Sequence, residues 1–510
     1  MAEPIPFEFG FPLGGVVKST AVANQPQNTT PSALNVWPYY YPDGRYMGGT
    51  RPGLTSAGFP GATPYGWCPA SWVGGNGIAV VTSAGTYVTD DGSTWNLRIA
   101  TPPSSDFCSC TVMNGVLYQS SSDLTAIRKY PLAGGSPTNL AVSNYDNGTP
   151  KGAVPQFCGL VHAHGGAIYA GGQATNPQIL YRCAINDPTD WDASRGDEGS
   201  AWNSAGVSGQ INRPIVGLLT HGNGCLLVGH VDGMTAVRGD PQLGGAVEEI
   251  DQYAGPIMNS AWCKTGDDST AILTREELNF MAPGCGSPRI SMSRFKLPSE
   301  LAAVNPGAGD TASLAYDGRW NGLFIFIRRK LSEVDFEFSQ FFFDLAGKGF
   351  YPMAFASGQF RLGVTFTKAI SSTRGACIAL KSGGGSYFDT DSTENIDSHV
   401  VIGPIPLGNA ILDGILSRIA FVLHSDSDPV KFEIYAGSSE QEALNGPRRY
   451  PHDGAGTLTR RGLSYSHHPR LTDHSAWVKL SSTGTNRWAI EKVVGESYPK
   501  RRRRVMRDAP

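Results

Sequence analysis

Short paired apolar runs recur along most of this chain and constrain its fold more than any other feature. Each unit has two such runs around a turn that contains Gly or Asp, as in "HGNGCLLVGHVDGMTAVRGD" and "YDGRWNGLFIFIRRK". The units follow one another at roughly 40–50 residues, a spacing that fits one propeller blade per unit. Central strands of a blade are buried on both faces, which accounts for near-continuous apolar runs such as "GLFIFI". The sequence therefore predicts an all-β fold with a β-propeller of about seven blades.

Composition agrees with short strands joined by tight turns. Charged residues make up 17% of the 510, below the usual quarter, while Gly numbers 63 and Pro 35. A disordered chain would be rich in charge and poor in aromatics, whereas this chain is 10% aromatic. Only two short stretches, "PSELAAV" and "SSEQEAL", are expected to be helical.

The pattern changes after about residue 395. Segments such as "SRIAFVLHSDSDPVKFEIYAGSS" alternate apolar and polar residues with period two, which is typical of half-buried antiparallel strands. We expect an extended N-terminal strap at 1–65, the propeller at 66–395, a β-sandwich-like platform at 396–498 and a basic tail at 499–510. In the alternative, the strap is part of the platform, which both termini then build around an inserted propeller.

The strap segment 27–54 is dense in Asn, Pro, Gly and Tyr, with no helical period. It also carries Trp37 and three consecutive tyrosines, Tyr39, Tyr40 and Tyr41. Large aromatic side chains are usually placed to be buried. We therefore expect this segment to lie pinned across other elements, with these aromatics as anchors.

One hairpin contains "DDGSTW", in which Asp90, Gly92, Thr94 and Trp95 fit the pattern D-x-G-x-T-W of an Asp-box turn. In such a turn the Asp side chain caps the hairpin, the Gly takes a positive φ and the Trp packs between blades. The pattern supports a propeller and indicates no activity, because the box is a structural device.

Nine cysteines are scattered through the first three quarters of the chain without a zinc-type spacing. We expect them to be reduced, structural thiols of a protein made in a cytoplasm. The first residues lack the basic and apolar regions of a signal peptide, and no run of about 18 apolar residues predicts a membrane span.

Catalytic motifs are missing: we find no nucleophile elbow, P-loop, HExxH or dinucleotide fingerprint. Two histidine groups, His162 with His164 and His467 with His468 and His474, have spacings at which imidazoles can share a metal. The simpler interpretation is polar side chains at a blade edge and in a solvated loop. The sequence therefore predicts no enzyme activity, no metal site and no cofactor.

Three acidic residues, Asp187, Asp190 and Asp192, resemble a calcium loop only loosely, and a turn capped by their side chains is favoured. The acidic pairs at 248–249 and 276–277 are adjacent in sequence, so on a strand their side chains point to opposite faces. A sialidase would need three converging arginines. The candidates are Arg213, Arg238, Arg275 and Arg319.

The end of the chain is basic. The net charge from residue 500 to the end is +5, because one acidic residue, Asp508, stands against six basic ones: Lys500, Arg501, Arg502, Arg503, Arg504 and Arg507. Since the whole chain carries −3, residues 1–499 carry −8. Such a tail can bind nucleic-acid phosphate, contact an acidic partner or remain solvated.

The strap resembles the N-terminal signature of a family of tail proteins of short-tailed bacteriophages, the tail nozzle or tail tubular B-like proteins. The likeness rests on a Leu-Asn-Val step, a Gly-Arg step and a Gly-Gly-x-Arg-Pro-Gly step. Here these are Leu34, Asn35, Val36, Gly44, Arg45, Gly48, Gly49, Arg51, Pro52 and Gly53. The stretches 168–191 and 226–245 and parts of the C-terminal region also look similar to that family.

The resemblance implies a structural virion protein that forms a ring, typically of six copies, below the portal and its adaptor. Double-stranded DNA would pass through its channel without sequence-specific binding, and tail fibre proteins would be further partners. Trp37, Tyr39, Tyr40, Tyr41, Arg45 and Arg51 would then make ring or partner contacts. Such a protein would be assembled in the host bacterial cytoplasm and found in the phage tail.

A second hypothesis is a propeller that hydrolyses or binds glycans, in the manner of a sialidase. The Asp box favours it, whereas the single copy of that box and the lack of a visible acid–nucleophile pair count against it.

Overall fold

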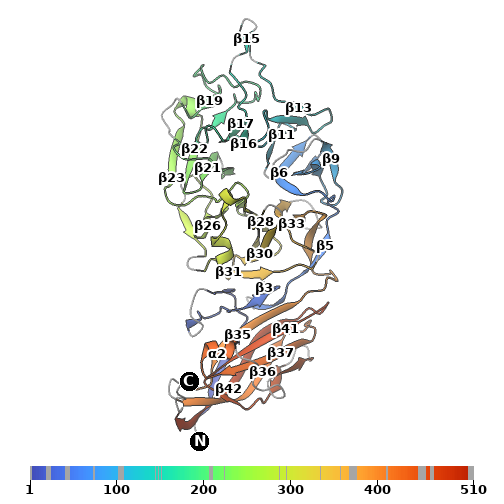
Figure 1. The fold of residues 1–510 in the computed structure, drawn as a ribbon, viewed down its shortest axis with the longest axis vertical. Coiled ribbons are helices and arrows are strands. Elements are labelled where there is room, and N and C mark those ends of the chain that lie inside the picture. Colours follow the sequence, from blue (N-terminus) through green and yellow to red (C-terminus); the bar gives the residue numbers. More distant parts are fainter. Residues whose placement is uncertain are drawn as a thin grey trace. The chain divides into compact units, whose positions relative to one another are not determined.

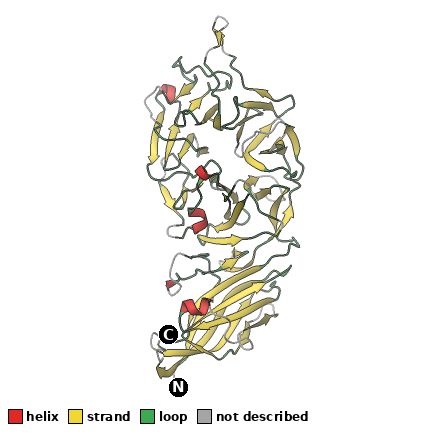
Figure 2. Ribbon diagram, viewed as in Figure 1, coloured by secondary structure: helices red, strands yellow, loops and turns green. Residues whose placement is uncertain are grey.

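The computed structural model describes residues 3–503 with internal gaps. The gaps are 19–23, 41–45, 73–74, 101–107, 144, 147–148, 151, 206–210, 223, 286–287, 294–295, 333–334, 357, 367–375, 409–411, 446–454 and 460–463. Strands dominate this part of the chain (Figure 2). Its helical segments are short: η2 (Pro241–Leu243), α1 (Ser299–Ala302), η3 (Pro306–Ala308) and α2 (Glu440–Asn445). None of the described helices is long and apolar enough to cross a membrane.

Seven four-stranded sheets form the blades of a propeller, as predicted (Figure 1). The first three are β6 (Pro64–Trp72), β7 (Gly75–Thr82), β8 (Gly85–Thr89), β9 (Asn96–Ile99); β10 (Ser109–Met113), β11 (Val116–Ser120), β12 (Arg128–Pro131), β13 (Thr138–Asn139); and β16 (Cys158–His164), β17 (Ala167–Gln173), β18 (Tyr181–Arg182), β19 (Trp202–Asn203). A small hairpin, β14 (Tyr145–Asp146) with β15 (Thr149–Pro150), precedes the third.

The remaining four sheets follow in chain order. They are β20 (Gly217–His221), β21 (Cys225–His230), β22 (Gly233–Arg238), β23 (Ala246–Asp251); β24 (Trp262–Lys264), β25 (Thr270–Leu273), β26 (Leu278–Met281), β27 (Arg289–Ser291); β28 (Thr311–Asp317), β29 (Gly322–Lys330), β30 (Phe336–Asp344), β31 (Gly349–Met353); and β32 (Leu362–Phe366), β33 (Ala376–Lys381), β34 (Gly384–Asp389) with β5 (Gly53–Ser56). The last sheet thus takes its fourth strand from before the first blade.

Local sequence explains the hairpins within each blade. Asn114 and Gly115 join β10 to β11 with φ of 52° and 72°, which is the geometry of a two-residue turn that favours Asn-Gly. Every residue of β21, "CLLVGH", is buried, as expected for a strand packed on both faces. The first strands of neighbouring blades contact one another at most junctions of the ring, and β32 contacts β6, which closes it.

The chain divides into two compact units. One comprises Met1–Leu54, Gln340–Ser357 and Asp389–Pro510, and the other comprises Thr55–Ser339 and Gly358–Phe388. The division differs from the linear order of strap, propeller, platform and tail, and has instead the alternative arrangement, in which both termini build one unit around an inserted propeller. Both termini build the first unit, and most of the propeller is the second.

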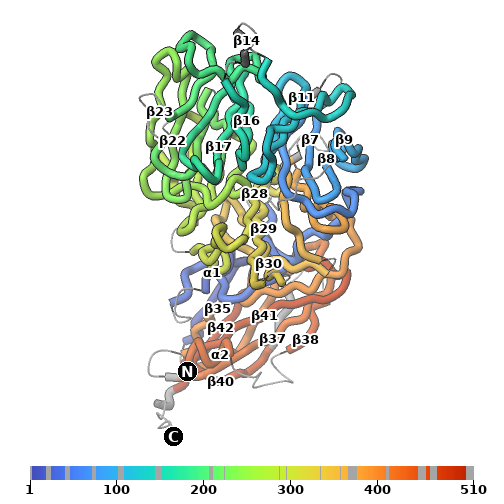
Figure 3. Tube along the Cα trace, turned by 45° about the horizontal axis from the view of Figure 1, so that its top comes forward, coloured from blue at the N-terminus to red at the C-terminus, as the bar shows by residue number. Residues whose placement is uncertain are grey.

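Besides β31 and the end of β30, the first unit contains two sheets. Figure 3 labels several of their strands, among them β35, β37, β38, β41 and β42. One has the order β3-β4-β42-β36-β39, with β1 also paired to β42 and β40 to β36; its strands are β1 (Ile5–Gly10), β3 (Val36–Tyr40), β4 (Tyr46–Thr50), β36 (Leu412–Leu423), β39 (Ser464–His467), β40 (Leu471–Asp473) and β42 (Ala489–Arg503). The other has the order β2-β35-β41-β37-β38; its strands are β2 (Ala33–Leu34), β35 (Ser398–Pro406), β37 (Val430–Gly437), β38 (Ala455–Leu458) and β41 (Ser475–Ser482).

Aromatic side chains fill the space between these sheets. Phe421 of β36 and Phe432 of β37 have ring centroids 5.1 Å apart, and both side chains are buried. Trp488 donates from its ring nitrogen to the hydroxyl of Ser398 on β35 at 2.9 Å. The platform is therefore a two-layer β-sandwich.

Two expectations for the termini differ from the structure. The strap is not coil throughout, because β2, β3 and β4 pair within it and with strands from the C-terminal region, β35 and β42. The basic segment does not begin as a loose tail, because β42 continues to Arg503, which pairs with Leu412 of β36. The strap strands pair with C-terminal strands more than 350 positions away, and Arg503 pairs with a residue about 90 positions away. Local sequence patterns do not reveal pairings between residues so far apart.

Candidate functional site

The first strands of the blades surround a pocket of about 420 Å³ inside the propeller unit, which we call the axial pocket. Six of the seven blades contribute, through β6, β10, β16, β20, β24 and β32 with the residues just before β10 and β24. The lining includes Tyr65, Trp67, Cys68, Cys108, Ser109, Cys110, Thr111, Val161, His162, Leu218, Leu219, Thr220, Asn259, Ser260, Trp262, Cys263, Lys264, Leu362 and Thr365. A concave, largely apolar site with a few polar groups is the usual form of a small-molecule site.

Several polar side chains of the pocket bond to the backbone of a neighbouring blade. The Ser109 hydroxyl donates to the Val161 carbonyl at 2.9 Å and accepts from the Val161 amide at 3.1 Å. Thr365 has the same two contacts with the backbone of Tyr316, at 3.1 and 3.0 Å. The Asn259 side-chain oxygen accepts from the Leu218 amide at 3.0 Å. These groups hold adjacent blades together, since each pairs a backbone group that the inner strand leaves without a ladder partner.

His162 and His164 lie side by side on β16, and both contact Thr220 on β20. The Thr220 amide donates to Nε2 of His162 at 3.1 Å, so this nitrogen carries a lone pair and the ring is neutral. Burial lowers the pKa of His162 to about 3, and the charges of His164 and Lys264 add to this effect. Burial and Lys264 also lower the pKa of His164.

A metal site at these two histidines would need further ligands from neighbouring side chains. Among the described residues, no group of three or more His, Cys, Asp or Glu side chains is placed to hold an ion. In the loop group, His468 contacts the Ser417 carbonyl, His474 lies 3.7 Å from Glu440, and the side chain of His467 lies outside the described residues.

Three of the pocket cysteines, Cys108, Cys110 and Cys263, are protonated thiols. Burial raises the pKa of Cys263 to about 12 and also raises that of Cys108. A hydrogen bond to Cys68, followed by burial, raises the pKa of Cys110. A thiol is a nucleophile only as its thiolate, so at neutral pH these side chains serve as small buried packing groups. All nine cysteines are free.

The arginines of the sialidase interpretation do not gather at the pocket. Arg213 pairs with Glu249 at 3.2 Å, Arg238 pairs with Glu248 at 3.3 Å, and Arg319 pairs with Asp317 at 2.7 Å. Arg275 is exposed. None of the four is among the residues described as lining the pocket.

The acidic stretch at 187–192 forms successive capped turns. Asp187 accepts from the Thr189 amide at 2.9 Å, and Asp190 accepts from the Asp192 amide at 3.1 Å. Asp192 in turn accepts from the Ser194 amide at 3.1 Å. The favoured interpretation, a turn with side-chain caps, is confirmed.

The Asp-box turn is present, but a different carboxylate caps it. Asp91, and not Asp90, accepts from the amides of Ser93 and Thr94, at 2.8 and 2.6 Å. Gly92 has the positive φ, 76°, that the pattern requires. Two adjacent aspartates left the sequence pattern ambiguous by one residue, and only the backbone path decides which one reaches the turn.

Trp95, the last residue of the box, packs between blades as predicted. Its ring nitrogen donates to the Ala57 carbonyl at 2.9 Å, and its ring meets that of Phe59 edge to face at 4.9 Å. It contacts a cluster shared by the first and last blades, with members such as Val80 and Ile378. The box therefore supports the closure of the ring.

The strap aromatics divide into buried and exposed members. Trp37 is 1% exposed and lies against Phe342, with ring centroids 4.4 Å apart. The hydroxyl of Tyr39 donates to the Thr50 carbonyl, and that of Tyr40 donates to Asp344. The Tyr40 side chain is 42% exposed. Tyr41 and Arg45 lie outside the described residues.

Arg51 is the centre of a buried polar joint in the first unit. Its guanidinium donates to both carboxylate oxygens of Glu394, to the Asn35 side chain and to two backbone carbonyls. It also lies 4.5 Å from the ring centroid of Phe355. With 1% of their surface exposed, Arg51 and Trp37 have almost none left for a partner. Contact with other subunits stays a prediction for Tyr39 and Tyr40.

Of the predicted basic tail, Lys500 and the backbone of Arg501, Arg502 and Arg503 belong to β42. Arg504 lies outside the described residues. Extension of the strand along β36 fixes these positions in a sheet, which the run of charges alone did not indicate.

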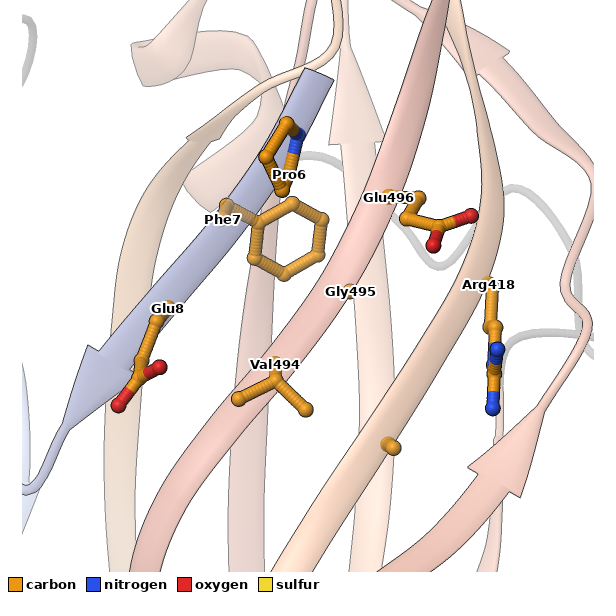
Figure 4. A pocket seen from close by; sticks show the side chains of 8 residues that line it. Pro6, Phe7, Glu8, Arg418, Val494, Gly495 and Glu496 are labelled. Carbon is orange, nitrogen blue, oxygen red and sulfur yellow. The ribbon is translucent and has the colours of Figure 1, made fainter. Parts of the chain in front are cut away.

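A second hollow, of about 550 Å³, lies on the seven-stranded sheet of the first unit (Figure 4). It is bounded by β1, β42 and β36, and Gly495 forms its floor; a Cβ there would lie 2.3 Å from a ring atom of Phe7. Glu8 on β1 and Arg418 on β36 stand on opposite sides of β42. The Phe7 ring therefore packs over Gly495, and the charged side chains of Glu8 and Arg418 do not converge in the hollow.

No family model and no curated protein matches this sequence. Among solved structures, a streptogramin B lyase is 11% identical over 66% of this chain and 98% of its own, with a TM-score of 0.39. The extracellular domain of a putative one-component system from B. thetaiotaomicron is 12% identical over 80% of this chain and 48% of its own, with a TM-score of 0.41. A gluconolactonase from Xanthomonas campestris is 12% identical over 54% of this chain and 87% of its own, with a TM-score of 0.32. The propeller assignment rests on the seven sheets of this chain.

Proposed function

We propose that this propeller protein is a structural component of a short-tailed phage tail, forming a homo-oligomeric ring, of six copies in the family it resembles, below the portal and adaptor. The observation that supports this proposal is the joint around Arg51. The signature residues Asn35 and Arg51 meet there, and through Glu394 they tie the N-terminal segment to the C-terminal one. A platform held together by both chain ends suits a subunit that must stay rigid under load.

The strap offers a surface for such assembly. The Tyr40 ring is 42% exposed, while its hydroxyl is held by Asp344. An aromatic ring that is already fixed loses little conformational freedom on binding, which favours its use in an interface. The proposal assigns Tyr40 to contacts with a neighbouring subunit or the adaptor.

Charge is compatible with a conduit for DNA. Residues 1–499 carry a net −8, and a channel that gripped phosphate strongly would slow its passage. In this proposal the DNA contacts the ring without sequence-specific binding, and the basic segment from Lys500 onward contacts protein or phosphate.

Negative-stain electron microscopy tests the proposal. The purified chain is imaged alone and mixed with the portal and adaptor proteins of its phage. Rings with an open axis, or added density on the portal complex, are the expected result. Isolated monomers of the 54.3 kDa chain that never associate with the portal would overturn it. Tyr40→Ala should weaken assembly, while the exposed Tyr253→Ala serves as a matched control.

A second candidate, favoured by the axial pocket, is a propeller that binds or cleaves glycans. Trp67 and Tyr65 offer aromatic surface for a sugar ring, and Lys264 offers a charge for an acidic sugar. A glycan array and a chromogenic sialoside assay test it. Binding or cleavage that Lys264→Met abolishes would favour this function, and inactivity in both assays would count against it.

A further inference from the structure

The axial pocket has the size of a small-molecule site. Its volume of about 420 Å³ lies within the range of roughly 300–1,000 Å³ that is usual for ligand pockets. All its lining residues belong to the propeller unit. The properties of its wall therefore limit what it can bind, whatever the role of the whole chain.

Lys264 is the one cation among the described residues that line this pocket. Among the described residues, none forms a hydrogen bond or an ion pair with the ammonium of Lys264. The groups on which its charge acts are the imidazoles of His162, His164 and His221, all of which have lowered pKa values. Three neutral imidazoles do not neutralise an ammonium, so an anion in the pocket would gain an ion pair of low exposure.

The rest of the wall is suited to a flat apolar body. The partly exposed Trp67 and Tyr65 supply aromatic surface, and leucines of β20 and β32 supply aliphatic surface. The hydroxyls of Ser109 and Thr365 and the amide of Asn259 already bond to the backbone of neighbouring blades. A polyol would find few of these groups free, whereas an aromatic or aliphatic body needs none of them.

We infer that the axial pocket binds a small organic monoanion with a flat apolar body, its negative group paired with Lys264 and its body against Trp67 and Tyr65. This site is independent of the proposed ring, so failure of one does not imply failure of the other. The ligand class is set by chemistry: one negative charge, a planar ring system and few hydroxyls.

Isothermal titration calorimetry of the full chain with 2-naphthoate tests the inference, with uncharged 2-naphthamide as the comparison ligand. We expect naphthoate to bind more tightly than naphthamide. Lys264→Met should weaken naphthoate binding about tenfold or more and leave naphthamide unchanged, while Lys264→Arg should retain binding because it keeps the charge. The exposed Lys431→Met, in the other unit, is the matched control.

Three outcomes would overturn the inference. The first is no naphthoate binding at millimolar concentration. The second is equal naphthoate affinity in the wild type and in folded Lys264→Met, with folding checked by circular dichroism. The third is methyl galactoside binding more tightly than naphthoate, which would show that the pocket prefers a polyol. If Lys264→Met does not fold, Lys264→Gln replaces it with the same expectation.

Discussion

The two terminal nitrogens of the Arg51 guanidinium donate to the two carboxylate oxygens of Glu394, at 3.0 and 3.1 Å, although the two residues are 343 positions apart. The Arg51 side chain is 1% exposed and the Glu394 side chain 11%. A bidentate pair of this kind is strong and geometrically specific, and removal of one partner leaves a buried charge uncompensated. The pair joins the strap to the segment that follows the last blade.

Loss of this pair should destabilise the first unit severely. Arg51→Ala or Glu394→Ala is expected to lower the free energy of unfolding by about 3–5 kcal/mol, and Arg51→Lys by less, since it keeps the charge but not the fork. Urea denaturation measures the change. Arg329→Ala, which removes a more exposed pair with Glu337, should cost about 1 kcal/mol or less. Equal losses in both variants would contradict the central role of Arg51.

The Trp37 ring is expected to contribute through packing. Trp37→Ala removes a side chain that is 1% exposed and packs at a tilt against Phe342, and should cost about 3–5 kcal/mol because it leaves a cavity. Thermal or urea unfolding checks this. Tyr253→Ala, at a side chain that is 86% exposed, should leave stability almost unchanged. A small loss in Trp37→Ala would show that the strap is not anchored through this ring.

Replacement of Asp90 and replacement of Asp91, the neighbouring aspartates of the Asp-box turn, should lower the stability by different amounts. Asp91→Ala removes the acceptor of two turn amides and should cost about 1 kcal/mol, whereas Asp90→Ala should have a smaller effect. The pair is a matched comparison, since both side chains are exposed and equal in size and charge. Urea midpoints of the two variants decide it, and a greater loss in Asp90→Ala would restore the assignment made from the sequence pattern.

Acidification should destabilise the propeller unit through His162. The folded-state pKa is about 3, below the ordinary value, so the unfolded chain takes up a proton first as the pH falls. Stability is thus retained above about pH 6.5 and declines between there and about pH 3. His162→Gln, whose side-chain oxygen can still accept from the Thr220 amide, should lose less stability than the wild type between about pH 7 and about pH 5.

Urea midpoints at the two pH values measure this difference. His468→Gln, at an exposed ring, is the control and should behave as the wild type does. If His162→Gln lost as much stability on acidification as the wild type, the buried imidazole would not be the responsible group.

Thiol titration should distinguish one cysteine from the rest. Cys285 is partly exposed, while the other eight cysteines are buried. In the native protein we expect about one thiol to react rapidly with Ellman's reagent, and all nine to react in denaturant. Cys285→Ser should abolish the rapid phase. Persistence of that phase would place the accessible thiol elsewhere.

The sequence by itself determined the blades. Apolar runs such as that of β29, joined by turns with Gly or Asn at positive φ, dictate hairpins, because both the alternation and the turn geometry are local properties. The period of these hairpins then predicted their assembly into a propeller. The Asp-box pattern located the turn, with an ambiguity of one residue between Asp90 and Asp91.

Only the tertiary structure decided which distant residues meet. Three features depend on contacts between segments far apart in the chain: the partner of Arg51, the continuation of the basic segment as β42, and the gathering of Lys264 with three histidines that come from two other blades. Burial set the protonation of His162 and of the pocket thiols, and burial is a property of the closed ring. Periodicity fixes which side of a strand faces inward, but closure of the ring determines what that side faces.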